Sequence, residues 1–317
     1  QFAIDVTAAN VTNVNTPGYV RQRPELEAAG DIDVGAKSFQ VGVDAPMVKR
    51  IFDRYLEFQI VDGRTEQGYS AAMQDYLQRV EGLFNEANGG GMSELLGNFW
   101  SSWQSLSTNP QGRTERTVVL AAAQDLVSRF REFSEDLTSI RMDARDEIRS
   151  LIAEVNSDAQ KIAELNNSIM AEERSNGDAN LLINERSRLI TSLAEKIGIN
   201  YIEDSSGNVA IYLAGGSALV AGSNARQLEM VVDDIRISGT TDLITATITA
   251  GELGAMLAVR DRLVPGYLDS LNSLAAGVIG AVNSRHTAGF TAEGEVAGNF
   301  FTPVGDAATA ARNMAVD

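Results

Sequence analysis

The sequence predicts a mainly α, multidomain α+β protein: an elongated helical bundle with one very long helix and an inserted small antiparallel β domain. Two observations support this fold class. Between Val119 and Ile169, apolar residues recur about every 3.6 positions, the period of an amphipathic α-helix. Between residues 199 and 250 the period changes to two, which is typical of half-buried β-strands.

The N-terminal segment is expected to be a helix that ends in a turn. An apolar helical run leads from Phe2 to Asn13, and Pro17 and Gly18 then predict a type II turn, because Gly readily adopts the positive φ that this turn requires. Residues 24–37 are polar and contain Gly, so we expect a loop. The alternation of Phe39, Val41 and Val43 predicts a strand that Pro46 interrupts.

Three helices follow in the sequence pattern. The first is expected from Ile51 to Ala87, although Gly63 and Gly68 each cost a helix interior about 1 kcal/mol. A short amphipathic helix spans Leu95 to Leu106, with Phe99, Trp100 and Trp103 expected in the core rather than stacking a sugar. The third, from about Thr114 to Arg174, would be ~90 Å long. A helix of that length indicates a rod-shaped bundle with partners of similar length.

A turn at 175–178 allows the next helix to fold back antiparallel on the long helix. This helix carries its inner face at Leu182, Arg186, Leu189, Leu193 and Ile197, and Gly198 is expected to be its C-cap. Strands are predicted around 201–204, 209–213, 218–220, 228–232, 235–237 and 243–248, with a hairpin turn at 205–208. A helical pattern returns at Gly251; Pro265 either kinks it or begins a new helix, which ends near His286.

Five parts are expected along the chain: an N-terminal segment over 1–50, a long-helix bundle domain over 51–198, an inserted β domain over 199–250, a returning helix over 251–290, and a loop over 291–317. At 317 residues with 44% hydrophobic and 22% charged residues, the chain can bury a large core. Its net charge of -17 argues against nucleic acid or an anionic membrane as partner. No apolar run approaches the ~20 residues of a membrane-spanning helix.

Residues for catalysis or cofactor binding are scarce. The absence of cysteine excludes disulfides, thiolate zinc sites and cysteine nucleophiles, and His286 is the only histidine, so no catalytic residue, cofactor or metal site is predicted. Residues 204–208 favour a hairpin over a calcium loop because the Gly is misplaced. The Gly-rich segment 215–222 lacks the Lys of a phosphate loop. Acidic and basic side chains alternate over 143–149, which favours a solvated helix face over a glycosidase pair.

The string from Asn10 to Arg23 resembles the A-N-N-(I/L)-A-N-x-N-T-P-G-Y motif of the bacterial flagellar axial proteins, which form the rod, the hook and the hook-filament junction. The match covers about ten consecutive positions. The resemblance assigns an assembly motif, which sets the turn and a subunit contact, to seven residues: Asn10, Asn13, Asn15, Thr16, Pro17, Gly18 and Tyr19.

Further stretches resemble the hook-associated proteins of the hook-filament junction. The segment 180–190 resembles their N-L-L-D-x-R-D-x-L-(I/V) helix, with a departure at Asn184, and 216–222 resembles their G-x-x-L-V-x-G strand and turn. Residues 251–261 and 283–290 resemble two more of their segments, in the same order. The predicted long helical middle separates this chain from the rod and hook proteins.

The resemblance implies a non-catalytic structural subunit of the flagellum, which joins hook to filament by self-assembly through its terminal helices. It implies an extracellular location at the hook-filament junction, type III export without a cleaved signal peptide, and a role in motility. The implied partners are copies of the chain in a ring, the hook protein, the second hook-filament junction protein, and an export chaperone that binds a C-terminal region absent here. Both extremities are therefore expected to be missing from this chain.

Two other functions remain open on the sequence alone. A secreted coiled-coil adhesin or effector would need the same rod-shaped bundle, but its copies would not have to assemble into a tube. A carbohydrate-active enzyme on an elongated scaffold would need a deep pocket lined by two carboxylates and aromatic side chains.

Overall fold

The structure, a computed structural model, describes residues 2–16, 18–28, 31–34, 37–40, 43–85, 91–175, 178–204, 207–291 and 294–317. The chain divides into two compact units. One consists of Gln1–Ala71 and Arg149–Ala255, and the other of Ala72–Ile148 and Met256–Asp317. No helix within the described residues is long and apolar enough to cross a membrane.

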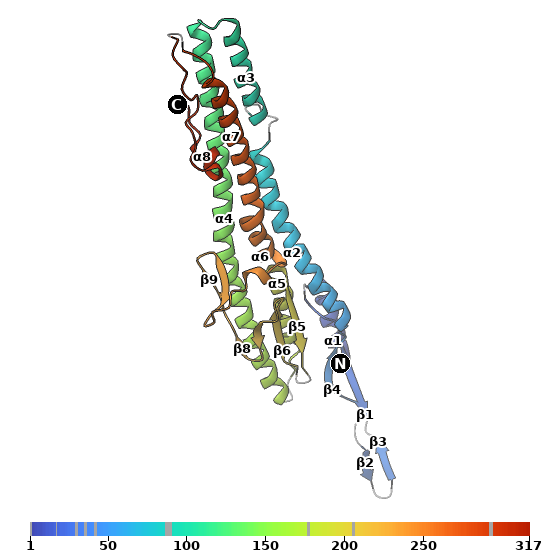
Figure 1. The fold of residues 1–317 in the computed structure, drawn as a ribbon. Helices are drawn as coiled ribbons and strands as arrows, with labels where there is room; N and C mark the ends of the chain where they lie inside the picture. The colour runs from blue at the N-terminus through green and yellow to red at the C-terminus, as the bar shows by residue number, and fades with distance from the viewer. Residues whose placement is uncertain are drawn as a thin grey trace. The chain divides into compact units, whose positions relative to one another are not determined.

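The predicted long helix is confirmed. Helix α4 (Arg113–Arg174) is continuous over 62 residues, and both units contain part of it (Figure 1). Its apolar seam is buried at the spacing that the sequence predicts, and its fully buried members include Leu126, Phe130, Leu137, Ile148 and Ile162. The period of the apolar residues therefore identifies the face of α4 that is covered by other elements.

In the first unit, helix α1 (Phe2–Thr12) leads into a ribbon of short strands. Strand β1 (Gln22–Ala28) pairs antiparallel with β4 (Val43–Arg50), and β2 (Asp31–Val34) pairs with β3 (Lys37–Gln40). The expectation of a loop over 24–37 was therefore wrong. A two-stranded ribbon does not require the alternation of apolar and polar residues by which strands are recognised in a sequence.

Pro46 does not interrupt the strand as predicted, because β4 runs through it. The ladder shifts register between Glu25 and Glu27, opposite Pro46. A proline is tolerated at such a bulge because no ladder hydrogen bond is required from it. Of the predicted strand over 39–43, Phe39 lies in β3 and Val43 in β4, and Val41 lies outside the described residues.

Helix α2 (Arg54–Leu83) is shorter than predicted at both ends. Asp53 fixes its start, because the Asp53 Oδ1 atom accepts hydrogen bonds from the N–H groups of Tyr55 (3.0 Å) and Leu56 (3.3 Å). Gly68 lies where α2 meets helix α5 (Asn180–Lys196): a Cβ at this position would overlap the carbonyl oxygen of Glu195.

Helix α5 folds back along α4, as predicted: Lys196 Nζ lies 2.8 Å from Asp158 Oδ2, while Arg186 bonds to Asn166 farther along α4. The C-cap of α5 is Ile197, in extended conformation, rather than Gly198. Gly198 instead permits a close approach, because a Cβ there would lie 2.8 Å from the Cβ of Ala250.

The change of period to two marks a β region, as predicted. Strands β5 (Ile199–Glu203), β6 (Val209–Leu213), β7 (Ala218–Ala221) and β8 (Asn224–Ala225) form an antiparallel sheet in that order, and β9 (Leu228–Val231) pairs with β10 (Asp234–Ile237). The prediction of a strand over 243–248 was wrong. Thr245–Thr247 form a 3₁₀ turn, in which the hydroxyl of Thr247 donates to the Ile244 carbonyl.

The second unit is a helical bundle made of α3 (Met92–Thr108), parts of α2 and α4, α7 (Val264–His286) and α8 (Ala310–Asn313). Phe84 contacts Phe133 of α4 and Tyr267 of α7. Phe99 is fully buried, as expected, but Trp100 is 48% exposed, so its predicted place in the core was wrong. One residue along a helix rotates a side chain by about 100°, which turns Trp100 away from the face that buries Phe99.

Pro265 follows a widened turn rather than a break. Helix α6 (Gly251–Ala258) continues through a π-turn (Val259–Leu263) into α7, and the N–H of Val264 donates to the Val259 carbonyl five residues earlier. The proline lacks an N–H and its ring crowds the carbonyl of residue i−4, and the π-turn accommodates both.

Candidate assembly site

The side chain of Asn10 closes the segment between α1 and β1. Its Nδ2 donates to the carbonyl of Gln22 (2.7 Å), and its Oδ1 accepts from the N–H of Gln22 (2.8 Å). The hydroxyl of Tyr19 also donates to Asn10 Oδ1 (3.1 Å). Asn10 therefore links three parts of the predicted motif region: the helix end, the residue after the turn, and the first residue of β1.

The predicted turn is present around Gly18. The N–H of Tyr19 donates to the Thr16 carbonyl (3.1 Å), and Gly18 has φ +78, close to the value of the third residue of a type II turn. Pro17 lies outside the described residues. Asn13 prepares the turn, because its carbonyl accepts from the N–H of Thr16 (2.9 Å) and its Oδ1 from the Thr16 hydroxyl (3.2 Å).

Asn15 is the described motif residue that stands apart: it is exposed, and its side chain has no partner among the described residues. The structure thus brings together Asn10, Asn13, Thr16, Gly18 and Tyr19. A Cβ added at Gly18 would lie 3.4 Å from the Cβ of Arg188, so the turn lies against α5.

Sequence reasoning missed the residues that receive these contacts. Gln22 contributes only its backbone to Asn10, and the carbonyl of Arg21 accepts from the N–H of Ile51 (2.8 Å). Backbone partners leave no residue-type signal in the sequence. For Arg186 of α5 the sequence did carry a signal, because a charged side chain stands at a position of the amphipathic pattern where an apolar one is expected.

Helix α1 exposes apolar side chains on much of its surface. Val6 is buried at 8% exposure, whereas Phe2 (43%), Ile4 (71%) and Val11 (69%) are exposed, as is Val14 (73%) just beyond the helix. Large apolar side chains gathered on one short helix mark an interaction surface.

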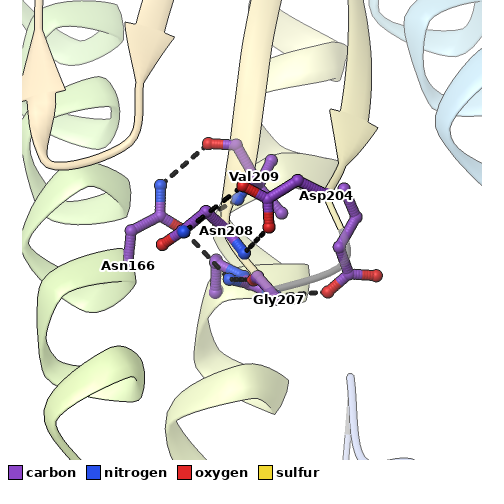
Figure 2. Close-up of polar contacts among 7 residues, drawn as sticks. Asn166, Asp204, Gly207, Asn208 and Val209 are labelled. Atoms are coloured by element: carbon purple, nitrogen blue, oxygen red, sulfur yellow. Dashed lines mark hydrogen bonds and ion pairs between the residues drawn. The ribbon is translucent and has the colours of Figure 1, made fainter.

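A second polar cluster, buried in the first unit, holds the β5–β6 hairpin against α4 and α5 (Figure 2). Arg186 is 2% exposed; its Nη1 donates to Asn166 Oδ1 (3.0 Å) and the Gly207 carbonyl (2.6 Å), and its Nη2 donates to Glu203 Oε1 (2.8 Å). Asn166 Nδ2 donates to the carbonyls of Val209 and Gly222, each at 2.8 Å. Burial lowers the pKa of Arg186, and the nearby Glu203 carboxylate opposes that shift.

This cluster has a structural role. Arg186 of α5 and Asn166 of α4 both bond to the β5–β6 hairpin, and the Arg186 side chain is buried, so the cluster holds these three elements together. At Asn184, where the sequence departs from the resembling helix, the side chain is buried and neither amide atom has a hydrogen-bond partner among the described residues.

The other segments considered in the sequence have structural roles. His286 ends α7, as predicted, and its Nδ1 lies 2.7 Å from the Gly298 carbonyl. Residues 204–208 connect β5 to β6, and Asp204 Oδ1 accepts from the Asn208 N–H (3.0 Å), so the hairpin is confirmed, although Ser205 and Ser206 lie outside the described residues. Within the described ranges, no three His, Cys, Asp or Glu residues are placed to hold a metal ion.

These features define the class of protein. A 62-residue helix, an inserted β region and an N-terminal helix followed by a turn at Gly18 are the features that a known family of flagellar structural proteins can be compared with. The family model of the flagellar hook-associated protein FlgK helical domain matches residues 77–301, and the chain belongs to this family.

Curated relatives support this assignment over nearly the whole chain. Flagellar hook-associated protein 1 of Bacillus subtilis is 27% identical over 99% of this chain and 70% of its own length. The protein of the same name from Salmonella typhimurium is 25% identical over 95% of this chain. The chain spans 57% of the length of the Salmonella protein.

A solved structure shows the same fold. The flagellar hook junction protein FlgK from Burkholderia pseudomallei superimposes with a TM-score of 0.68 at 24% identity. The similarity covers 77% of this chain and 46% of that protein.

Proposed function

We propose that this chain is a non-catalytic structural subunit that joins the flagellar hook to the filament by self-assembly through its terminal helices. The observation that carries the proposal is the match of residues 77–301 to the FlgK helical domain, continued N-terminally by the assembly motif. The hydrogen bonds of Asn10 and the turn at Gly18 give that motif a physical role: they fix the direction in which the chain leaves α1.

The exposed apolar side chains of α1 support the self-assembly part of the proposal. Phe2, Ile4, Val11 and Val14 would be buried if α1 paired with another helix, in its own chain or in a neighbouring subunit. We extend this to the partners: copies of the chain in a ring, the hook protein on one side, and the second hook-filament junction protein on the other.

The proposed location follows from the proposed role. A subunit between hook and filament is extracellular, and we propose that it reaches this place through the flagellar type III apparatus without a cleaved signal peptide. An export chaperone is a further proposed partner. The five-part division of the chain, from the N-terminal segment to the last loop, is likewise proposed as its domain organisation.

Substitution at Gly18 tests the proposed role of the turn. Gly18→Val forces a branched side chain to φ +78, which costs at least ~1–2 kcal/mol. Gly18→Asn is the matched control, because Asn tolerates this conformation. We expect Gly18→Val cells to lose swimming and shed filaments, Gly18→Asn cells to swim, and both purified chains to retain the helical signal of α4. Normal swimming with Gly18→Val would count against the proposal.

A secreted coiled-coil adhesin or effector is the second candidate, since a long helix serves it equally well. The Asn10–Gln22 bridge and the turn at Gly18 favour the junction subunit, because an adhesin has no need of a fixed exit from an N-terminal helix. Filaments that stay attached in cells without this protein would favour the adhesin.

A further inference from the structure

A group of exposed cations lies at the base of the β1–β4 ribbon. The basic patch consists of Arg21, Arg23, Lys49 and Arg54, all exposed. Among the described residues, Arg21, Arg23 and Arg54 have no ion-pair partner, and Lys49 has only a distant one, Glu25 Oε1 at 3.8 Å. Such an exposed pair contributes little to stability.

The basic patch holds like charges in direct opposition. Arg23 of β1 is the cross-strand partner of Lys49 of β4. Like charges directly opposite each other destabilise a ladder. In a chain with a net charge of -17, four exposed cations with a single distant ion pair among the described residues are the exception and indicate a site that receives an anionic partner.

Apolar side chains adjoin the basic patch. Ile51, the residue after β4, is 47% exposed, and Tyr55, in the first turn of α2, is 72% exposed. Arginine and tyrosine are enriched among the residues that dominate the binding energy of protein interfaces. This combination favours a protein partner.

The same unit also carries a complementary surface. An open groove of about 360 Å³ is lined by the carboxylates of Asp62 and Glu66 from α2, by Tyr69, and by residues at the start of β5 that include Asn200. Apolar side chains such as Ile199 form other parts of its wall. We call it the acidic groove. Its charge is opposite to that of the basic patch, and both surfaces offer a tyrosine.

We propose that the basic patch of one copy of this chain docks on the acidic groove of the next copy, as a lateral contact between subunits. This inference rests on the proposed junction role and deepens it, because it names a contact outside the terminal helices. We infer that the contact is used in one direction, with each copy offering its basic patch to one neighbour and its acidic groove to another; such a head-to-tail contact generates a ring or a helical array.

Cysteine cross-linking tests the contact cleanly, because the chain has no cysteine of its own. The purified full chain is prepared as Tyr55→Cys and, separately, as Glu66→Cys, and the two are mixed under mild oxidation. We expect a mixed disulfide dimer in at least ~tenfold higher yield than when Met142→Cys, at a 61% exposed position of the other unit, replaces Tyr55→Cys. The double variant Tyr55→Cys/Glu66→Cys should form a ladder of oligomers.

Charge reversal supplies the second measurement. In the Tyr55→Cys chain, Arg23→Glu/Lys49→Glu should lower the yield of mixed dimer by ~tenfold, since like charges would then face each other. Introducing Asp62→Lys into the Glu66→Cys chain should restore it. All variants should melt within a few degrees of the unaltered chain.

Three results would overturn the proposal. The first is a yield of mixed disulfide dimer equal to that of the Met142→Cys control. The second is cross-linking of Tyr55→Cys chains among themselves as readily as in the mixture. The third is a yield of mixed dimer that the reversed charges leave unchanged. The last two would indicate, respectively, a two-fold contact and a contact that is not electrostatic. None of them bears on whether cells without this protein lose their filaments, so failure of this contact is distinguishable from failure of the junction role.

Discussion

Replacement of Asn10 by Ala tests whether one side chain fixes the exit from α1. The change removes two hydrogen bonds to the Gln22 backbone, at 2.7 and 2.8 Å, and one from the Tyr19 hydroxyl, at 3.1 Å. Hydrogen bonds contribute a net ~0.5–1.5 kcal/mol each, and these three share one part-buried side chain, so we expect a combined loss of about 2 kcal/mol. Since 1.4 kcal/mol is a factor of ten, the segment should open ~30-fold more often.

Hydrogen–deuterium exchange at the Gln22 amide measures this opening, because Asn10 Oδ1 accepts that N–H. Fragmentation mass spectrometry should show ~30-fold faster exchange at residue 22 in Asn10→Ala, with α4 unchanged. Asn15→Ala is the matched control, since the Asn15 side chain has no partner among the described residues and should leave exchange unchanged. Equal exchange at residue 22 in Asn10→Ala and the unaltered chain would refute the reasoning.

Three further predictions concern stability, each read from thermal or denaturant unfolding. Gly63→Ala should stabilise α2 by ~1 kcal/mol, because nothing lies within 4 Å of an added Cβ. Gly68→Ala should instead destabilise the protein by ~1–3 kcal/mol, because its Cβ would overlap the Glu195 carbonyl. Equal effects of the two substitutions would contradict the packing of α2 on α5. Arg186→Met should destabilise by ~3 kcal/mol because it removes the buried cation that binds the Glu203 carboxylate and the Gly207 carbonyl, and a neutral result would show that the cluster is dispensable. Burial raises the pKa of Tyr201 to about 12, above the ~10 of an unfolded chain. Between these two pH values the folded state holds a proton that the unfolded state has lost, so the free energy of unfolding should fall as pH rises from 10 to 12. Tyr201→Phe should make that fall less steep.

The helices could be predicted because burial imposes a period on the sequence. The buried face of α4 can be predicted from Val119 to Ile169, since each turn must bury a side chain on the same face. The sheet from β5 to β8 could be predicted for the same reason, because its apolar residues recur with a period of two. In the ribbon of β1 to β4 the sequence carries no such pattern, and the strands were mistaken for a loop.

The candidate site was only partly predictable. The turn at Gly18 follows from the chemistry of Pro and Gly, so its hydrogen bond and its positive φ could be expected. The role of Asn10 could not, because its partner is a backbone group twelve residues away. The 3₁₀ turn over Thr245–Thr247 shows the same limit. β-branched residues favour a strand, but a threonine hydroxyl that bonds the local backbone, as that of Thr247 does, favours a turn.

The central claim is that this chain serves the hook-filament junction, and electron microscopy of flagella from a strain that lacks its gene tests that claim most directly. The account predicts bare hooks, with filament protein released into the medium, and restored filaments when the gene is returned. Full-length filaments still attached to hooks in the deletion strain would contradict it.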